Sequence, residues 1–124
     1  MDNEIGRDLD ELPERPSVDI PDADFVLLER AARATGAVRV EVVDGEGYVN
    51  LHFGDGSVVH SWNPLVFSGD ALDLLVRLRL QVYVQEQATL VMNADHEWAS
   101  EQHGNDAGAA TRRAITRAAG EAEY

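Results

Sequence analysis

The sequence predicts a single α+β domain in which short antiparallel strands pack against three helices. Three observations lead to this class. The length of 124 residues suits one domain. Segments with apolar residues at helical spacing alternate with segments in which apolar and polar residues alternate one by one. Tight turns rich in glycine separate the segments in which apolar and polar residues alternate. The predicted order is α-β-β-β-α-β-β-α, with about five strands in one sandwich-like antiparallel sheet.

The first helix is predicted from Asp22, an N-cap behind Pro21, to about Thr35, where Gly36 ends it. The second helix is expected over roughly Gly69–Arg79, with Ser68 or Asp70 as its cap.

The third helix is capped by Asp106, runs to Ala119 and stops at Gly120. It carries Arg112, Arg113 and Arg117, which complement the helix dipole and are expected to form a solvated face.

The strands are predicted from two-residue alternation. They cover residues 38–42, 49–53, 58–62, 80–84 and 90–92, whereas residues 94–106 are polar and are expected to form a loop. The sequence shows no internal repeat.

Residues 1–21 are predicted to form a flexible acidic arm, and residues 22–124 a single α+β domain. Residues 1–24 contain nine acidic residues and two arginines, together with Pro13, Pro16 and Pro21. Such a segment buries too little apolar surface to fold alone. It is either a solvated leader or an interaction tail for a basic partner.

The net charge of −13 is the strongest compositional signal. A chain so acidic repels nucleic-acid phosphates and anionic lipid, so we expect no direct binding to nucleic acid or membranes. Basic protein surfaces are the expected partners, including the nucleic-acid-binding faces of other proteins. The absence of cysteine excludes disulfides and thiolate chemistry and suits the cytoplasm. Asp2, Asn3 and Glu4 do not resemble the start of a signal peptide.

The histidines do not predict a metal site. If Asp55 and Gly56 form a two-residue turn, Phe53 lies opposite Val58, so that His52 and His60 point to opposite faces and His60 lies on the apolar face.

Other catalytic patterns are missing as well. His96-Glu97 lacks the second histidine of a zinc protease, and the glycine pairs lack the remainder of a phosphate loop. We therefore expect no enzyme and no cofactor. A weak cation site within residues 95–106 is the remaining metal hypothesis.

The predicted partner-binding residues fall into two groups. Trp62 is expected to plug the sheet edge, whereas Trp98 stands in a polar segment, which favours an exposed contact residue. The first group belongs to the acidic arm and consists of Asp8, Asp10, Glu11, Glu14 and Asp19. The second group lies around Trp98 and consists of Asp95, Glu97 and Trp98 itself.

Two segments resemble small phage and prophage proteins of the phage ABA-sandwich group. They are Trp62-Asn63-Pro64-Leu65 followed by Gly69-Asp70-Ala71-Leu72, and the stretch 110–119. The resemblance covers roughly residues 25–120. It implies an α/β sandwich and an accessory role in a temperate phage, where small acidic proteins often block a host machine.

The leading hypothesis is a phage-encoded inhibitor, anti-CRISPR-like, that occupies a basic surface on a protein or ribonucleoprotein complex in the cytoplasm of the bacterial host. One alternative is a phage structural or assembly accessory protein that acts as a homo-oligomer. A further alternative is an enzyme with an unrecognised site around residues 95–106.

Overall fold

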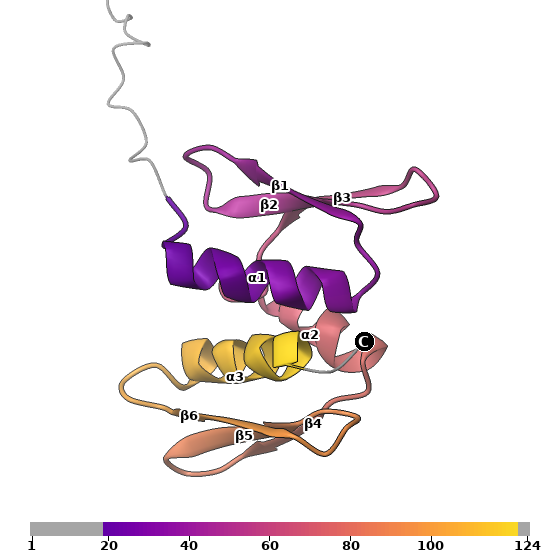
Figure 1. Ribbon diagram of the computed structural model, residues 1–124. Helices are drawn as coiled ribbons and strands as arrows, with labels where there is room; N and C mark the ends of the chain where they lie inside the picture. Colours follow the sequence, from indigo (N-terminus) through magenta and orange to yellow (C-terminus); the bar gives the residue numbers. More distant parts are fainter. Residues whose placement is uncertain (1–18, 122–124) are drawn as a thin grey trace, which may run out of the picture.

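The computed structural model describes residues 19–121, which form two α-β-β-β units followed by a third helix (Figure 1). The first unit comprises α1 (Asp22–Ala34), β1 (Arg39–Val43), β2 (Tyr48–His52) and β3 (Val58–Trp62). The second comprises α2 (Ser68–Arg77), β4 (Gln81–Val84), β5 (Ala88–Met92) and β6 (Trp98–Gln102), and the last element is α3 (Ala107–Glu121). The order of elements thus repeats, although the sequence shows no repeat.

The two sheets form the outer layers, and the helices lie between them (Figure 1). The strand orders are β1-β2-β3 and β4-β5-β6, and all pairings are antiparallel. The predicted α+β class is confirmed. The expectation of about five strands in one sheet is wrong, because six strands form two separate sheets.

The strand that the sequence did not predict is β6. It lies in the polar segment expected to be a loop, and it pairs with β5 through Val91↔Ala99 and Leu90↔Ser100. Only Ala99 is buried in this strand. A strand that buries one small side chain has almost no apolar alternation, so its pairing with β5 and its contacts with α3 hold it in place.

Small side chains make up most of the buried surface of α1 and α3. Ala31 and Ala32 of α1 and Ala114, Ala118 and Ala119 of α3 are 0–1% exposed. At the end of α3, a Cβ atom on Gly120 would come within 3.0 Å of the Arg30 Cβ atom. Glycine at this position therefore lets the end of α3 approach α1 closely.

The turn between β2 and β3 is one residue longer than predicted. The Phe53 N–H donates to the Ser57 carbonyl at 3.0 Å, so His52 lies opposite Val58. The loop is Gly54–Gly56, and Gly56 has the positive φ of 90° that a three-residue hairpin loop requires at its last position.

This register moves His60 to the outer face of the sheet. Leu51 pairs with Val59 rather than with His60, and a bulge follows between Val49 and Leu51. His60 is exposed, so its predicted place on the apolar face is wrong. No three acidic or histidine side chains in residues 19–121 lie together as a possible metal site.

The helix starts differ in detail from the predictions. Asp22 is the first helical residue and Pro21 is the N-cap, while α2 starts at Ser68 without a side-chain cap. Asp106 does cap α3, since its Oδ1 atom accepts the Ala109 N–H at 2.9 Å.

Within residues 19–121, each helix is too short or too polar to cross a membrane.

Replacing Ala118 with leucine should destabilise the protein by about 1–3 kcal/mol, because Ala118 is 1% exposed and the core has no space for the added atoms. The measurement is urea unfolding followed by circular dichroism. Ala23→Leu makes the same change at an exposed position on α1 and should alter stability by less than about 0.5 kcal/mol. Equal effects of the two variants would contradict the close packing of the core around Ala118.

Candidate functional site

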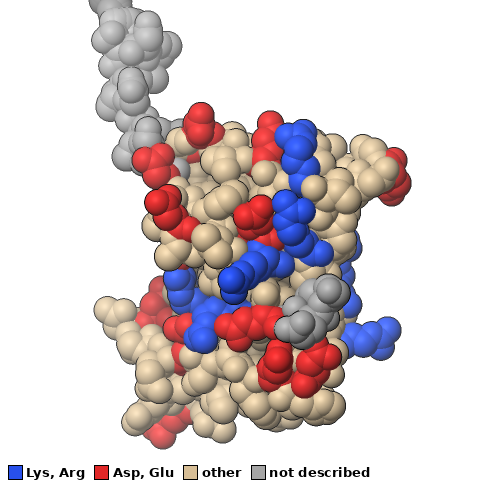
Figure 2. Space-filling model, in the orientation of Figure 1, with Lys and Arg blue, Asp and Glu red and all other residues tan. Residues whose placement is uncertain are grey.

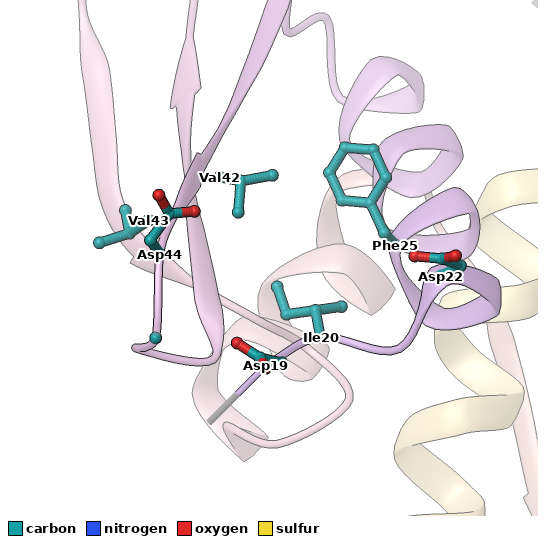
Figure 3. A pocket seen from close by; sticks show the side chains of 8 residues that line it. Asp19, Ile20, Asp22, Phe25, Val42, Val43 and Asp44 are labelled. Atoms are coloured by element: carbon teal, nitrogen blue, oxygen red, sulfur yellow. The ribbon is translucent and has the colours of Figure 1, made fainter. Parts of the chain in front are cut away.

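A pocket of about 440 Å³ lies between the start of α1 and the turn that joins β1 to β2 (Figure 3). Its lining residues come from two segments of the chain: Asp19, Ile20, Asp22, Phe25, Val42, Val43, Asp44 and Gly45. Three of these side chains carry carboxylates, and among the described residues that line the pocket there is no arginine, lysine or histidine.

The helical wall forms where the chain enters α1. The Phe25 N–H donates to the Pro21 carbonyl at 2.9 Å and closes the first turn. Asp22 and Asp24 lie in this turn, where the helix dipole favours a carboxylate. Ile20, just before the helix, packs against the core and brings Asp19 to the pocket.

The opposite wall is the β1–β2 turn, which Asn63 holds in place. Asn63 is 4% exposed, and its Nδ2 atom donates to the Gly47 carbonyl at 2.7 Å. The Asn63 backbone N–H in turn donates to Asp70 Oδ2 at 2.9 Å. The segment 62–64 therefore links the start of α2 to the turn that carries Asp44.

The pocket has an apolar floor and an acidic rim. Figure 3 shows the side chains of Ile20, Phe25 and Val42 pointing toward one another, while Val43 points away. The carboxylates of Asp19, Asp22 and Asp44 surround this apolar patch. Figure 2 shows acidic side chains at the corner where α1 begins, whereas several arginines lie over the helical layer.

An apolar floor ringed by carboxylates suits an amphipathic cation. The methylene stem of an arginine or lysine side chain packs on apolar atoms while its charged end stays at the rim. Carboxylates accept charge-assisted hydrogen bonds from such groups.

Asp19 is the predicted site residue that the structure places at this pocket. Asp8, Asp10, Glu11 and Glu14 lie outside the described residues. Trp98 begins β6, and Asp95 and Glu97 lie in the turn between β5 and β6. This sheet is the other outer layer, so the structure does not bring these residues together with Asp19 (Figure 1).

Trp98 is 52% exposed, as predicted, and lies beside Tyr83 with the ring centroids 5.6 Å apart. The turn before it is organised by buried Asn93, whose Oδ1 atom accepts the N–H groups of Asp95 and Glu97. Glu97 Oε1 accepts from Asn93 Nδ2 at 3.1 Å. This carboxylate therefore has a structural contact within its own turn.

The other polar groups of residues 95–106 also hold the fold together. His103 Nε2 lies 2.8 Å from Oγ1 of buried Thr89, which also contacts Thr111 Oγ1 at 2.7 Å. Glu101 pairs with Arg117 at 2.7 Å. These contacts join β5, β6 and α3, so the region serves to align the second sheet on its helix.

The three arginines of α3 do not form the solvated face that the sequence predicted. Arg112 Nε donates to the Leu65 carbonyl at 3.0 Å, Arg113 pairs with Asp24 of α1, and Arg117 pairs with Glu101 of β6. Each arginine thus connects α3 to a different part of the chain. The sequence holds one signal that the three arginines do not share a face. Arg113 and Arg117 are i,i+4 neighbours, whereas Arg112 lies outside this pair and points in another direction from the helix.

Sequence reasoning missed most of the pocket. The sequence predicts Asp22 as a helix cap and places Val42 in a strand, and it gives no local signal that Phe25 or Asp44 lines a pocket. The pairing of residues 19–25 with residues 42–45 depends on how α1 packs on the first sheet, which no local pattern reveals.

Comparison with known proteins finds no matching family model, no matching curated protein and no matching solved structure.

Asp70, which accepts the Asn63 N–H, should make the stability of the protein depend on pH. Burial raises the pKa of Asp70 above its usual 3.8; the Asn63 N–H opposes this increase, and Asp73 adds to it. The folded protein therefore holds this proton more tightly than the unfolded chain does. Ionisation of Asp70 consequently costs stability as the pH rises from about 3.8 through the folded-state pKa.

Asp70→Asn removes this cost and keeps an oxygen for the Asn63 N–H. The melting temperature of the variant relative to wild type should be higher at pH 7 than at pH 3.5. Calorimetry at both pH values checks this. A difference that does not change with pH would show that burial of Asp70 does not govern its ionisation.

Proposed function

We propose that this protein is an acidic binding protein that occupies a basic surface on a protein partner, with the pocket beside α1 receiving a cationic side chain of that surface. The observation that carries the proposal is the acidic rim of Asp19, Asp22 and Asp44 around an apolar floor. Neither feature alone defines a cation site; the combination matches both ends of an arginine or lysine side chain.

Three rim carboxylates suit a guanidinium group better than a small ion. A guanidinium presents several N–H donors in a fixed plane and is weakly hydrated, so it stacks on apolar and aromatic surfaces. Phe25 in the floor offers such a surface. Arginine is therefore the side chain that fits the pocket best.

The charge of the whole chain supports the same function. A net charge of −13 accelerates encounter with a basic partner and repels acidic ones. This attraction acts over about 10 Å at moderate ionic strength, so it weakens as salt is added. The pocket then selects among basic surfaces by the side chain that it accepts.

The more specific form of the proposal is inhibition of a nucleic-acid-handling complex in a bacterial host, as an anti-CRISPR protein does. Its support is the resemblance of residues 62–72 and 110–119 to phage accessory proteins, together with the physical likeness of spaced carboxylates to phosphates. Arginines that hold nucleic acid also accept carboxylates as partners.

The test compares two triple variants that remove equal charge. Asp19→Asn with Asp22→Asn and Asp44→Asn neutralises the rim, whereas Asp55→Asn with Glu86→Gln and Glu121→Gln neutralises exposed carboxylates elsewhere. Binding to a fluorescent arginine-rich peptide is measured by anisotropy at low and high salt. We expect the rim variant to bind at least about tenfold more weakly than the control variant, since it loses charge-assisted hydrogen bonds.

Equal losses in the two variants would show that only net charge matters and would reject the pocket. Affinity that does not fall with salt would reject the basic-surface function itself. Capture from a bacterial lysate with the wild type and both variants then identifies the partner as the protein retained by the control variant and lost by the rim variant.

A further inference from the structure

A second surface, on α2, has the opposite character to the acidic pocket. In residues 19–121, the three most exposed large apolar side chains are Val76 at 64%, Val84 at 62% and Leu72 at 59%. Leu72 and Val76 are neighbours on α2 at i,i+4 spacing. Val84 ends β4 and lines the same groove as Leu72.

This groove has a volume of about 400 Å³ and runs between α2 and the start of α3. Its apolar lining includes Leu72, Leu75, Val84 and Ile115, and it shares no residue with the acidic pocket. We call Leu72, Leu75, Val76, Val84 and Ile115 the α2 patch.

The patch is additional to the core face of α2. Ala71 and Leu74 are the buried residues of this helix, and they pack into the core. A surface helix needs one apolar face, yet α2 has a second one open to solvent. α2 lies behind α1 and α3 in Figure 1, at the side of the helical layer. Apolar surface of this kind marks an interface.

The charges beside the patch indicate what covers it. Asp73 and Arg77 form an i,i+4 ion pair on α2, with Arg77 Nε 2.9 Å from Asp73 Oδ2 and both side chains about half exposed. When two such helices pack antiparallel about a two-fold axis, Asp73 of one comes near Arg77 of the other, and the reverse. The surface is thus complementary to itself.

The rest of the molecule restricts where two copies can meet. Each carries a net charge of −13, so most approaches bring acidic surfaces together. At the α2 patch the charges of Asp73 and Arg77 cancel, and the exposed apolar side chains of Leu72 and Val76 belong to the same helix.

We propose that the α2 patch is a homodimer interface in which the α2 helices of two copies pack antiparallel, with Asp73 of each copy facing Arg77 of the other. Burial of Leu72, Val76 and Val84 drives association, and the two ion pairs select the antiparallel orientation.

Salt distinguishes this contact from binding to a basic partner. Added salt screens the repulsion between two chains of charge −13, so it should favour the dimer. The same salt weakens binding at the acidic pocket. The two surfaces therefore respond to ionic strength in opposite directions.

The first experiment is analytical ultracentrifugation of the full chain, up to about 0.5 mM protein because a small interface binds weakly, at low and high NaCl. We expect a monomer–dimer equilibrium that shifts toward dimer in high salt. Leu72→Glu with Val76→Glu should raise the dissociation constant at least about tenfold. Val26→Glu with Val38→Glu adds the same charge at exposed apolar positions elsewhere and should leave dimerisation near the wild-type value.

The second experiment tests the orientation with two charge variants. Asp73→Arg gives an α2 patch flanked by two arginines, and Arg77→Asp gives one flanked by two aspartates. Each variant alone should dimerise more weakly than wild type, whereas an equimolar mixture should form a heterodimer. Since both variants lack the intrahelical pair, recovery in the mixture can come only from pairing between chains.

A chain that stays monomeric at the highest concentration in high salt would overturn the proposal. So would a dimer that survives Leu72→Glu with Val76→Glu, or a mixture that associates no better than its components. Circular dichroism of each variant confirms that the fold is intact before association is compared.

Discussion

The close contact between α1 and α3 is the constraint on which the rest of the structure depends. The sheets are outer layers and meet only through the helices, so the spacing of this contact sets where both sheets lie (Figure 1). Gly120 lets the end of α3 lie close to Arg30 and Ala31 of α1, and most buried side chains of the two helices are alanines. Larger side chains would move the helices apart, and both sheets would then lose apolar contacts with them. Small residues thus have a larger structural effect here than their own buried area suggests.

The arginines of α3 then orient the elements that pack around this helix. Their partners lie on α1, on β6 and in the loop before α2. These side chains are partly exposed, and such ion pairs contribute at most about 1 kcal/mol each. Their effect is therefore on orientation more than on stability. Arg113 also engages Asp24, which leaves Asp19, Asp22 and Asp44 as the carboxylates that line the pocket.

The two proposed surfaces follow from one conflict in the composition. A strongly acidic chain attracts basic partners but repels its own copies. The function proposed for the acidic pocket depends on the first property, while the interface proposed at the α2 patch, with Asp73 and Arg77 balanced, avoids the second. Because the surfaces share no lining residue, a dimer can present two acidic pockets at once. Two linked pockets would bind a repeated basic surface more tightly than one.

The sequence by itself determined the helices, five of the six strands and the acidic character, because periodicity, turn residues and charge are local properties. Only the tertiary structure decided the sixth strand, whose single buried Ala99 carries no pattern. The same holds for the β2–β3 register, in which one extra loop residue moves His60 to the other face. The pocket is likewise tertiary, since residues 19–25 and 42–45 meet only when α1 packs on the first sheet. The apolar periodicity along the chain determines which residues become buried, but the distances between segments depend on how the whole core packs.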